Sequence, residues 1–183
     1  MQKKRTVGHL SKSSEETMKK DEMKVLDVLR RHAKENINEL CKRCDFSPQK
    51  VARIIKNLEK KEIIWGYSAV DDGEASDLKH FVLILKRNTK SVESNIRKGV
   101  ITDFLDDYVP NQLKIENIYF THGSYDGVVT FYAPDLTSAK KLIEEIIKRI
   151  GDYFNEYLLL ETLFPIRKQG LKNPKLKNLV EYL

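Results

Sequence analysis

Residues 47–61 carry the clearest alternation of apolar and polar positions in the chain. The apolar residues recur at helical spacing and fall within one arc of a helix: Val51, Ile54, Ile55 and Leu58. Ser47 and Pro48 come before them, a side-chain oxygen suited to a helix N-cap and a proline suited to the first helical position. The pattern predicts an amphipathic helix whose apolar side packs on a core.

The opposite face of this predicted helix is polar and basic. Its central residues are Gln49, Arg53, Lys56 and Lys60, and Lys50 and Asn57 flank them. A helix with one apolar side and one donor-rich side can pack on a domain and still enter the major groove of DNA. We therefore interpret this helix as a recognition helix.

The neighbouring segments complete a helix-turn-helix with a wing. Helical periodicity predicts a first helix from Asp21 to about His32, through Val25, Leu26, Leu29 and Ala33. A short helix over Asn38–Arg43 and a turn through Asp45-Phe46 precede the recognition helix. The β-branched and aromatic run Ile63–Val70 predicts a strand after it.

The second half of the chain alternates strands and helices. Strands are expected at His80–Leu85, Leu113–Thr121, Val128–Tyr132 and Tyr157–Phe164, and helices at Ser91–Tyr108 and Asp135–Ile150. This order predicts an α+β, ferredoxin-like βαββαβ domain. Two helices cover one face of such a sheet, yet the first and last strands are largely apolar on both faces. A second copy of the chain is the expected cover, which makes the protein at least a dimer.

These patterns divide the chain into five parts. Residues 1–20 are expected to form a basic, mobile arm, either solvated or reaching into a neighbouring groove. Residues 21–70 form the winged helix-turn-helix, and residues 71–78 form an acidic, Gly- and Ser-containing linker. Residues 79–167 form the ferredoxin-like domain. Residues 168–183 form a basic tail, which the pattern leaves open between a short amphipathic helix and a frayed end.

Composition and charge agree with a DNA-binding part joined to one that does not bind polyanions. Of 183 residues, 40% are hydrophobic and 33% charged, which is typical of a soluble folded protein. No apolar run approaches the roughly 20 residues of a membrane span, and none follows the basic N-terminus as in a secretory signal, so we expect no membrane partner and a cytoplasmic location. Residues 1–70 hold 17 Lys and Arg against 10 Asp and Glu, whereas residues 71–165 hold 11 against 16.

Candidate chemistry is sparse. Cys41 and Cys44 form a Cys-x-x-Cys without a second cysteine pair or a nearby His pair, so we expect buried thiols and no metal or other cofactor; a thiol switch is the alternative. The histidines are spread over an arm, a helix and two strands: His9, His32, His80 and His122. No catalytic residue is predicted.

The segments Ser47–Glu59 and Ile63–Val70 resemble the DNA-binding domain of the Lrp/AsnC (feast/famine) transcriptional regulators. The shared features are the Ser-Pro opening, a valine three residues after the proline, a mid-helix arginine, Leu-Glu and an Ile-x-Gly-Tyr run. Glu62 replaces the family's usual helix-ending glycine, and Ile54 replaces a second arginine. The resemblance implies sequence-specific binding to double-stranded DNA, through Ser47, Gln49, Lys50, Arg53, Lys56, Asn57 and Lys60, and sheet-to-sheet pairing of subunits in dimers or larger even-numbered assemblies.

A second resemblance lies in Thr121–Asp126, which is similar to the family's Gly-x-Tyr-Asp turn, near which amino acids and related effectors bind. It implies an effector site at His122, Gly123, Ser124, Tyr125 and Asp126. The same residues also suit purely structural roles: an unusual backbone angle at Gly123, a hairpin closed at Asp126 and packing by Tyr125. The family's Pro-Gly-Val before the last strand is absent.

Two other functions fit the same outline. The sirohaem decarboxylases share this two-domain plan, but an enzyme needs titratable residues that converge in a pocket, and a basic recognition helix would have no use there. A non-specific architectural DNA-binding protein would share the steep salt dependence of a regulator. It would differ in showing no preference among DNA sequences.

Overall fold

The computed structural model describes residues 12–71, 76–102 and 113–178. The chain forms two compact units: residues 1–70 with 169–171, and residues 71–168 with 172–183. Each unit has a hydrophobic core of its own. They are therefore described separately.

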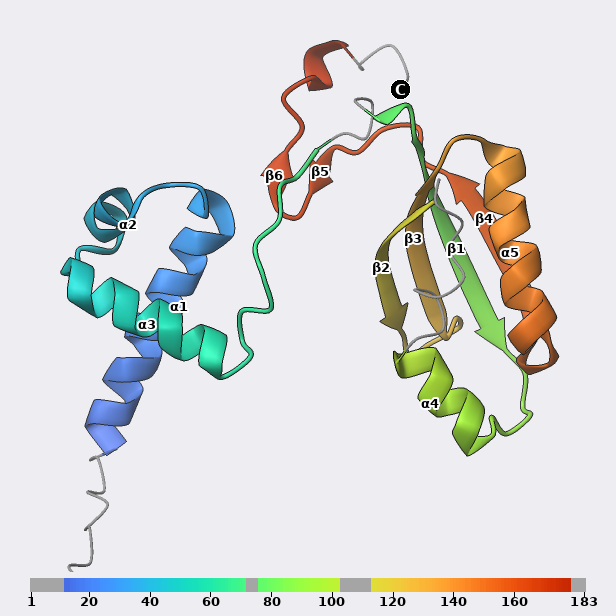
Figure 1. The fold of residues 1–183 in the computed structure, drawn as a ribbon, viewed down its shortest axis with the longest axis horizontal. Helices are drawn as coiled ribbons and strands as arrows, with labels where there is room; N and C mark the ends of the chain where they lie inside the picture. Colours follow the sequence, from blue (N-terminus) through green and yellow to red (C-terminus); the bar gives the residue numbers. More distant parts are fainter. Residues whose placement is uncertain (1–11, 72–75, 103–112, 179–183) are drawn as a thin grey trace, which may run out of the picture. The chain divides into compact units, whose positions relative to one another are not determined.

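The N-terminal unit is a three-helix core, with α1 at Lys12–His32, α2 at Ile37–Cys44 and α3 at Pro48–Lys60 (Figure 1). All three helices contribute buried residues: Val25, Leu29, Leu40, Cys41, Cys44, Val51, Ile54 and Leu58. The Asn36 side chain accepts a hydrogen bond from the Glu39 N–H and caps α2. Asp45 ends α2 in the left-handed conformation, at φ 53°, and the turn into α3 follows.

Helix α1 begins at Lys12, nine residues before the predicted start at Asp21. Residues 12–20 therefore belong to the helix and not to an arm as predicted, while residues 1–11 lie outside the described part. The segment is rich in good helix formers, and Glu15 and Glu16 each stand four residues before a lysine, the spacing that supports an exposed helix. Since almost no large apolar residue lies there, core periodicity alone missed it.

The predicted strand at Ile63–Val70 is not formed. Residues 12–71 contain helices and connecting segments but no strand, and an extended segment without a neighbouring strand has no partner for ladder hydrogen bonds. The chain instead leaves α3 through Ile63 and Ile64, whose N–H groups both donate to the Leu58 carbonyl. Ile64 packs against the helical core, and the Trp65 side chain is 95% exposed.

The C-terminal unit has the predicted βαββαβ order. Its elements are β1 (Lys79–Arg87), α4 (Ser94–Thr102), β2 (Lys114–Phe120), β3 (Gly127–Ala133), α5 (Leu136–Ile150) and β4 (Phe154–Glu161). The four strands are antiparallel in the order β2-β3-β1-β4. This topology confirms the α+β, ferredoxin-like prediction.

One face of this sheet carries the core. Helix α5 lies against that face (Figure 1), and its Leu142, Ile143 and Ile146 pack with alternate residues of the strands, among them Phe81 and Phe131. No described helix packs on the other face. There the sheet presents Val82, Ile84, Val128, Leu158 and Leu160, of which Leu160 is 50% exposed.

The chain after β4 differs from the prediction. Strand β4 begins at Phe154, three residues early, and ends at Glu161. The tail turns back on itself in a short hairpin of β5 (Arg167–Lys168) and β6 (Leu171–Lys172), followed by the 3-10 turn η3 (Leu176–Asn178). Gln169 and Gly170 both have positive φ, 48° and 83°, as a two-residue hairpin turn requires. Residues 167–172 are therefore not a frayed end, while the alternative of a short amphipathic helix, which depends on Leu176, Leu179, Val180 and Leu183, lies mostly outside the described part.

Candidate nucleic-acid interface

The start of α3 is fixed by its first two residues. The Ser47 hydroxyl oxygen accepts a hydrogen bond from the Lys50 N–H at 3.4 Å, and Pro48 occupies the first turn. The helix buries Val51, Ile54 and Leu58 against α1 and α2. Burial of this side leaves the opposite side of α3 facing outward.

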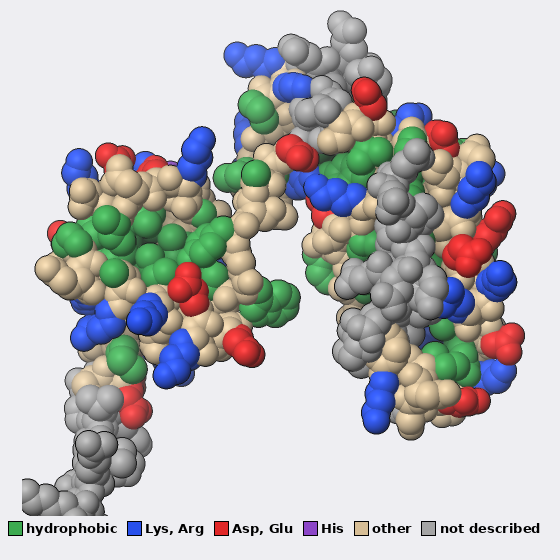
Figure 2. Space-filling view, in the orientation of Figure 1, with side chains coloured by type: hydrophobic (Ala, Val, Ile, Leu, Met, Phe, Trp, Pro, Cys, Tyr) green, Lys and Arg blue, Asp and Glu red, His purple; other side chains and the backbone are tan. Residues whose placement is uncertain are grey.

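The outward side of α3 carries a basic row, which we define as Gln49, Arg53, Lys56 and Lys60. All four side chains are exposed. Among the described residues, none of the three cations in the row has an ion-pair partner within 4 Å. Figure 2 shows Lys and Arg side chains at the upper and the lower margin of this unit. The basic row therefore has charges and donors available to an anionic partner.

Lys50, also predicted to bind DNA, is engaged within its own unit. Its Nζ lies 2.7 Å from the Asp21 carboxylate of α1 and 3.7 Å from the centre of the Phe46 ring. The Lys50 side chain is 33% exposed and that of Asp21 22%. A cation held by a half-buried carboxylate and a ring face is less available to a phosphate.

Asn57, the other flanking residue, is engaged in the same way. The Glu22 carboxylate, also from α1, accepts hydrogen bonds from Asn57 Nδ2 at 2.7 Å and from Lys61 Nζ at 2.8 Å. Glu22 is 8% exposed, which makes it the one buried charged residue in the part that the structure describes. A buried carboxylate is tolerated when it is paired and hydrogen-bonded, as here.

The roles of Asp21 and Glu22 were not predicted from the sequence. Their partners lie in α3 or directly after it, two helices further along the chain, and helical periodicity does not show which α1 residue faces which α3 residue. The available signal was weak: two adjacent acidic residues in an otherwise basic segment, just ahead of the apolar positions of α1.

The predicted effector turn has a structural framework of its own. The Asp126 carboxylate accepts a hydrogen bond from the Arg87 N–H at 2.8 Å, and the Asp126 N–H donates to the Leu85 carbonyl. Gly123 has φ 150°, which side-chain-bearing residues rarely adopt. These contacts fix the turn against β1, while His122, Gly123 and Ser124 are exposed and Tyr125 is half-buried.

A small apolar cavity of about 70 Å³ adjoins this turn. Its wall includes Leu85, Ile118, Val129, Ile146 and Phe154, with Arg87 and Asp126 as its charged members. The predicted effector residues other than Asp126 do not line it. The cavity is of a size for a small apolar group.

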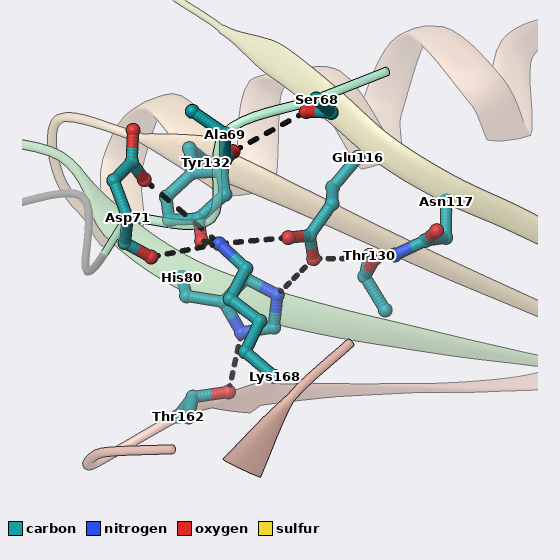
Figure 3. Close-up of polar contacts among 10 residues, drawn as sticks. All are labelled: Ser68, Ala69, Asp71, His80, Glu116, Asn117, Thr130, Tyr132, Thr162 and Lys168. Atoms are coloured by element: carbon teal, nitrogen blue, oxygen red, sulfur yellow. Dashed lines mark hydrogen bonds and ion pairs between the residues drawn. The ribbon is translucent and has the colours of Figure 1, made fainter. Parts of the chain in front are cut away.

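A polar cluster occupies one end of the uncovered sheet face (Figure 3). Lys168 Nζ lies 2.9 Å from the Glu116 carboxylate and donates to the Tyr132 hydroxyl, and His80 contacts Glu116 at 3.1 Å and Thr162 at 2.7 Å. Burial raises the pKa of the Glu116 carboxyl, but the hydrogen bond and charge of Lys168 outweigh it, and the net pKa lies below its usual value. Burial lowers the pKa of Lys168, but its bonds to Tyr132 and Glu116 leave it raised. Lys168 thus ties the C-terminal hairpin to the sheet.

The described residues contain no group of three or more His, Cys, Asp or Glu side chains arranged to hold a metal ion. Cys41 and Cys44 are free thiols buried in the helical core, and burial raises the pKa of the Cys44 thiol. Over the same described residues, no helix combines the length and apolarity needed to cross a membrane.

The comparisons with known proteins define the class first. Residues 22–64 match a family model described as winged helix-turn-helix DNA-binding. This match spans α2, α3 and the C-terminal half of α1, so it covers the residues of the basic row. No curated protein matches the sequence.

Solved structures define the whole fold. An AsnC family transcriptional regulator from Agrobacterium tumefaciens superposes with TM-score 0.62 at 17% identity, covering 81% of this chain and 92% of its own. A Neisseria meningitidis transcriptional regulator in complex with L-Met gives 0.63 at 17%, covering 90% and 98%. The feast or famine regulatory protein of M. tuberculosis, complexed with L-methionine, gives 0.60 at 18%, covering 82% and 95%. The chain has the fold of the Lrp/AsnC regulators, so the resemblance predicted from residues 47–70 is confirmed for the fold.

Proposed function

We propose that this protein is a sequence-specific, DNA-binding transcriptional regulator of the Lrp/AsnC type. The observation that carries the proposal is the basic row on an N-capped helix, within a segment that matches winged helix-turn-helix DNA-binding domains. The fold of the whole chain, shared with transcriptional regulators, supports it. An enzymatic role has no comparable support, since every solved structure named above is a regulator. We assign the protein to the cytoplasm, where such a regulator meets DNA.

The residues of the basic row are expected to make different DNA contacts according to their position along α3. Gln49 and Arg53 lie in the N-terminal half, which reaches base edges when a helix-turn-helix docks. Arg53 suits a bidentate contact to guanine and Gln49 one to adenine. Lys56 and Lys60 lie one or two turns further on and suit phosphates, as does the Ser47 hydroxyl. Because α1 engages Lys50 and Asn57, the proposal leaves these two residues out of the contact set predicted from the sequence.

Binding sites selected from random DNA provide the test. Arg53→Ala is expected to lower affinity for the selected site by about 1–3 kcal/mol and to relax the preference at one base pair per half-site. Lys56→Ala is expected to weaken binding to all sequences alike and to shallow the log K against log salt slope by about 1. Selection that yields no preferred site would instead favour the non-specific architectural function.

We propose further that the uncovered sheet face pairs with a second copy. Its apolar residues include Leu158 and Leu160, at 37% and 50% exposed, and burying an exposed apolar strip is the usual source of dimer stability. Light scattering on the full chain is expected to give a dimer or a larger even-numbered species. Leu160→Lys is expected to reduce it, while Leu136→Lys, on the helix side of the same unit, leaves it unchanged. A monomeric wild-type protein at micromolar concentration would refute the pairing.

An effector site near the turn at residues 122–126 completes the proposal. Two proteins of this fold were solved with L-Met or L-methionine, and the cavity beside the turn has the size and the apolar lining for a small apolar group. In a thermal-shift screen of amino acids, a ligand at 100 times its Kd adds roughly 2.7 kcal/mol of stability. Tyr125→Ala should reduce that response more than it lowers the melting temperature without ligand. A screen without any shift would leave the turn a structural role only.

A further inference from the structure

The flank of α3 beside the basic row is neutralised from within the domain. Lys50 and Lys61 each form an ion pair with an adjacent acidic residue of α1, at 2.7 Å to Asp21 and 2.8 Å to Glu22. The acidic side chains are the more buried partners, at 22% and 11% exposed against 33% and 43% for the lysines. These contacts are part of the packing between α1 and α3 and are not a loose surface pairing.

The neutralised residues form a row of their own. Lys50, Asn57 and Lys61 are spaced by seven and four residues, so they stack along one side of α3. On a helical wheel this side is next to the basic row of Gln49, Arg53, Lys56 and Lys60. Two carboxylates of α1 therefore border the surface proposed to face DNA, and they hold two of the five Lys and Arg side chains that lie between Pro48 and Lys61.

We infer that Asp21 is a specificity-determining residue, an inference that rests on the proposed function. By holding Lys50, it lowers the affinity that any DNA sequence gains from phosphate contacts. Sequence-independent affinity comes almost entirely from such contacts, and each one adds about 0.9 to the slope of log K against log salt. A recognition helix with fewer free lysines depends more on the bases that Arg53 and Gln49 read.

The effect differs between specific and non-specific complexes because of where Lys50 lies. It belongs to the N-terminal half of α3, which sits deepest in the groove once the helix is docked. A released Lys50 is free to reach a phosphate when the helix rests loosely on unrelated DNA, whereas in the docked complex we expect its place near the base edges to keep it from the backbone. Releasing Lys50 should therefore favour unrelated DNA over the preferred site.

Asp21→Asn tests this inference, because it removes the charge and keeps the size of the side chain. At 0.1 M salt we expect the affinity for scrambled DNA to rise about five- to tenfold, with a slope steeper by about 0.9. The affinity for the selected site should rise about twofold or less. Adding Lys50→Gln to Asp21→Asn should return the slope for scrambled DNA to that of the wild type.

Asp27→Asn is the matched control. It makes the same change of charge on the same helix and releases Arg30, whose partner Asp27 lies 2.8 Å away on an exposed part of α1. It should leave the ratio of affinities for selected over scrambled DNA unchanged. Circular dichroism confirms that each variant is folded before binding is measured.

Three results would overturn the inference: an unchanged affinity of Asp21→Asn for scrambled DNA, a lower one, or an equal rise for selected and scrambled DNA. A lower affinity would mean that Asp21 positions Lys50 for a DNA contact. These outcomes differ from failure of the proposed function itself. In that case the wild-type protein would select no site, and Lys56→Ala would not change the salt slope.

Discussion

Glu22 offers the sharpest test of how α1 holds the proposed recognition helix. Its buried carboxylate accepts two hydrogen bonds, one from Asn57 of α3 and one from the charged Lys61, the C-cap of that helix. Replacing Glu22 with Ala removes both and leaves the half-buried Asn57 amide without that partner. A hydrogen bond to a charged group contributes about 1.5–3 kcal/mol to the free energy of unfolding. An ion pair whose lysine is as exposed as Lys61 contributes about 1 kcal/mol or less.

We therefore expect Glu22→Ala to lower the free energy of unfolding of the N-terminal unit by about 2–3 kcal/mol. Glu22→Gln should have a smaller effect, since both hydrogen bonds go to the same oxygen of Glu22 and an amide oxygen can accept them without the charge. Lys61→Ala should cost about 1 kcal/mol or less. The expected order of stability is wild type, Gln, then Ala.

Native-state hydrogen exchange on the full chain is the assay, because it reports each unit separately. Amides of α1 and α3 should lose protection in Glu22→Ala, while those of β1 and β3 provide an internal reference. Asp27→Asn, whose side chain is 62% exposed, should change protection by no more than about 0.5 kcal/mol. If Glu22→Ala is no more destabilising than Asp27→Asn, the reasoning about this carboxylate is wrong.

Three further predictions concern single sites. Glu62 has the left-handed backbone angle φ 55°, so Glu62→Gly should stabilise the N-terminal unit by about 0.5–1 kcal/mol. This value is the backbone strain that glycine relieves, minus the larger conformational entropy that glycine loses on folding; a loss of stability in urea unfolding would contradict it. The Cys44 thiol is fully buried and its pKa is raised by burial, so a disulfide reagent should label it only as fast as the N-terminal unit unfolds. Rapid labelling of Cys44 in the native protein would contradict this prediction. The pKa of Glu116 is lowered in the folded state, so its contribution to stability is present at neutral pH and is lost as the pH falls through that lowered pKa. The destabilisation caused by Glu116→Gln should therefore become smaller below about pH 4. A constant difference in stability between the variant and the wild type from pH 7 to pH 3 would refute the role of the Lys168 ion pair.

Local patterns predicted the elements whose signals are local. The Ser47-Pro48 opening and the apolar arc of α3 predicted that helix to within a residue or two, because capping and periodicity act over one or two turns. The order of elements after His80 predicted the ferredoxin-like topology for the same reason. The start of α1 was missed because residues 12–20 are helical through propensity and not through a buried face.

Partners distant in the chain were not predictable in the same way. The run Ile63–Val70 has the composition of a strand, but a strand also needs a neighbour, and the sequence pattern does not supply one. Lys50 has the sequence character of a DNA contact, yet Asp21 and Phe46 hold it. The hairpin at Gln169-Gly170 did have a local signal, a Gly-containing pair between short basic segments, which the prediction for the tail at residues 168–183 did not use.

The central claim is that α3 reads bases in the major groove through Arg53, and protection of guanine N7 from methylation tests it most directly. N7 lies in the major groove, so a docked recognition helix shields it. The wild-type protein on its selected site is expected to protect at least one guanine in each half-site. Arg53→Ala, at a concentration that restores occupancy, should lose that protection, while Lys56→Ala should keep it. Equal protection by the wild type and Arg53→Ala, or no N7 protection by the wild type, would contradict the account.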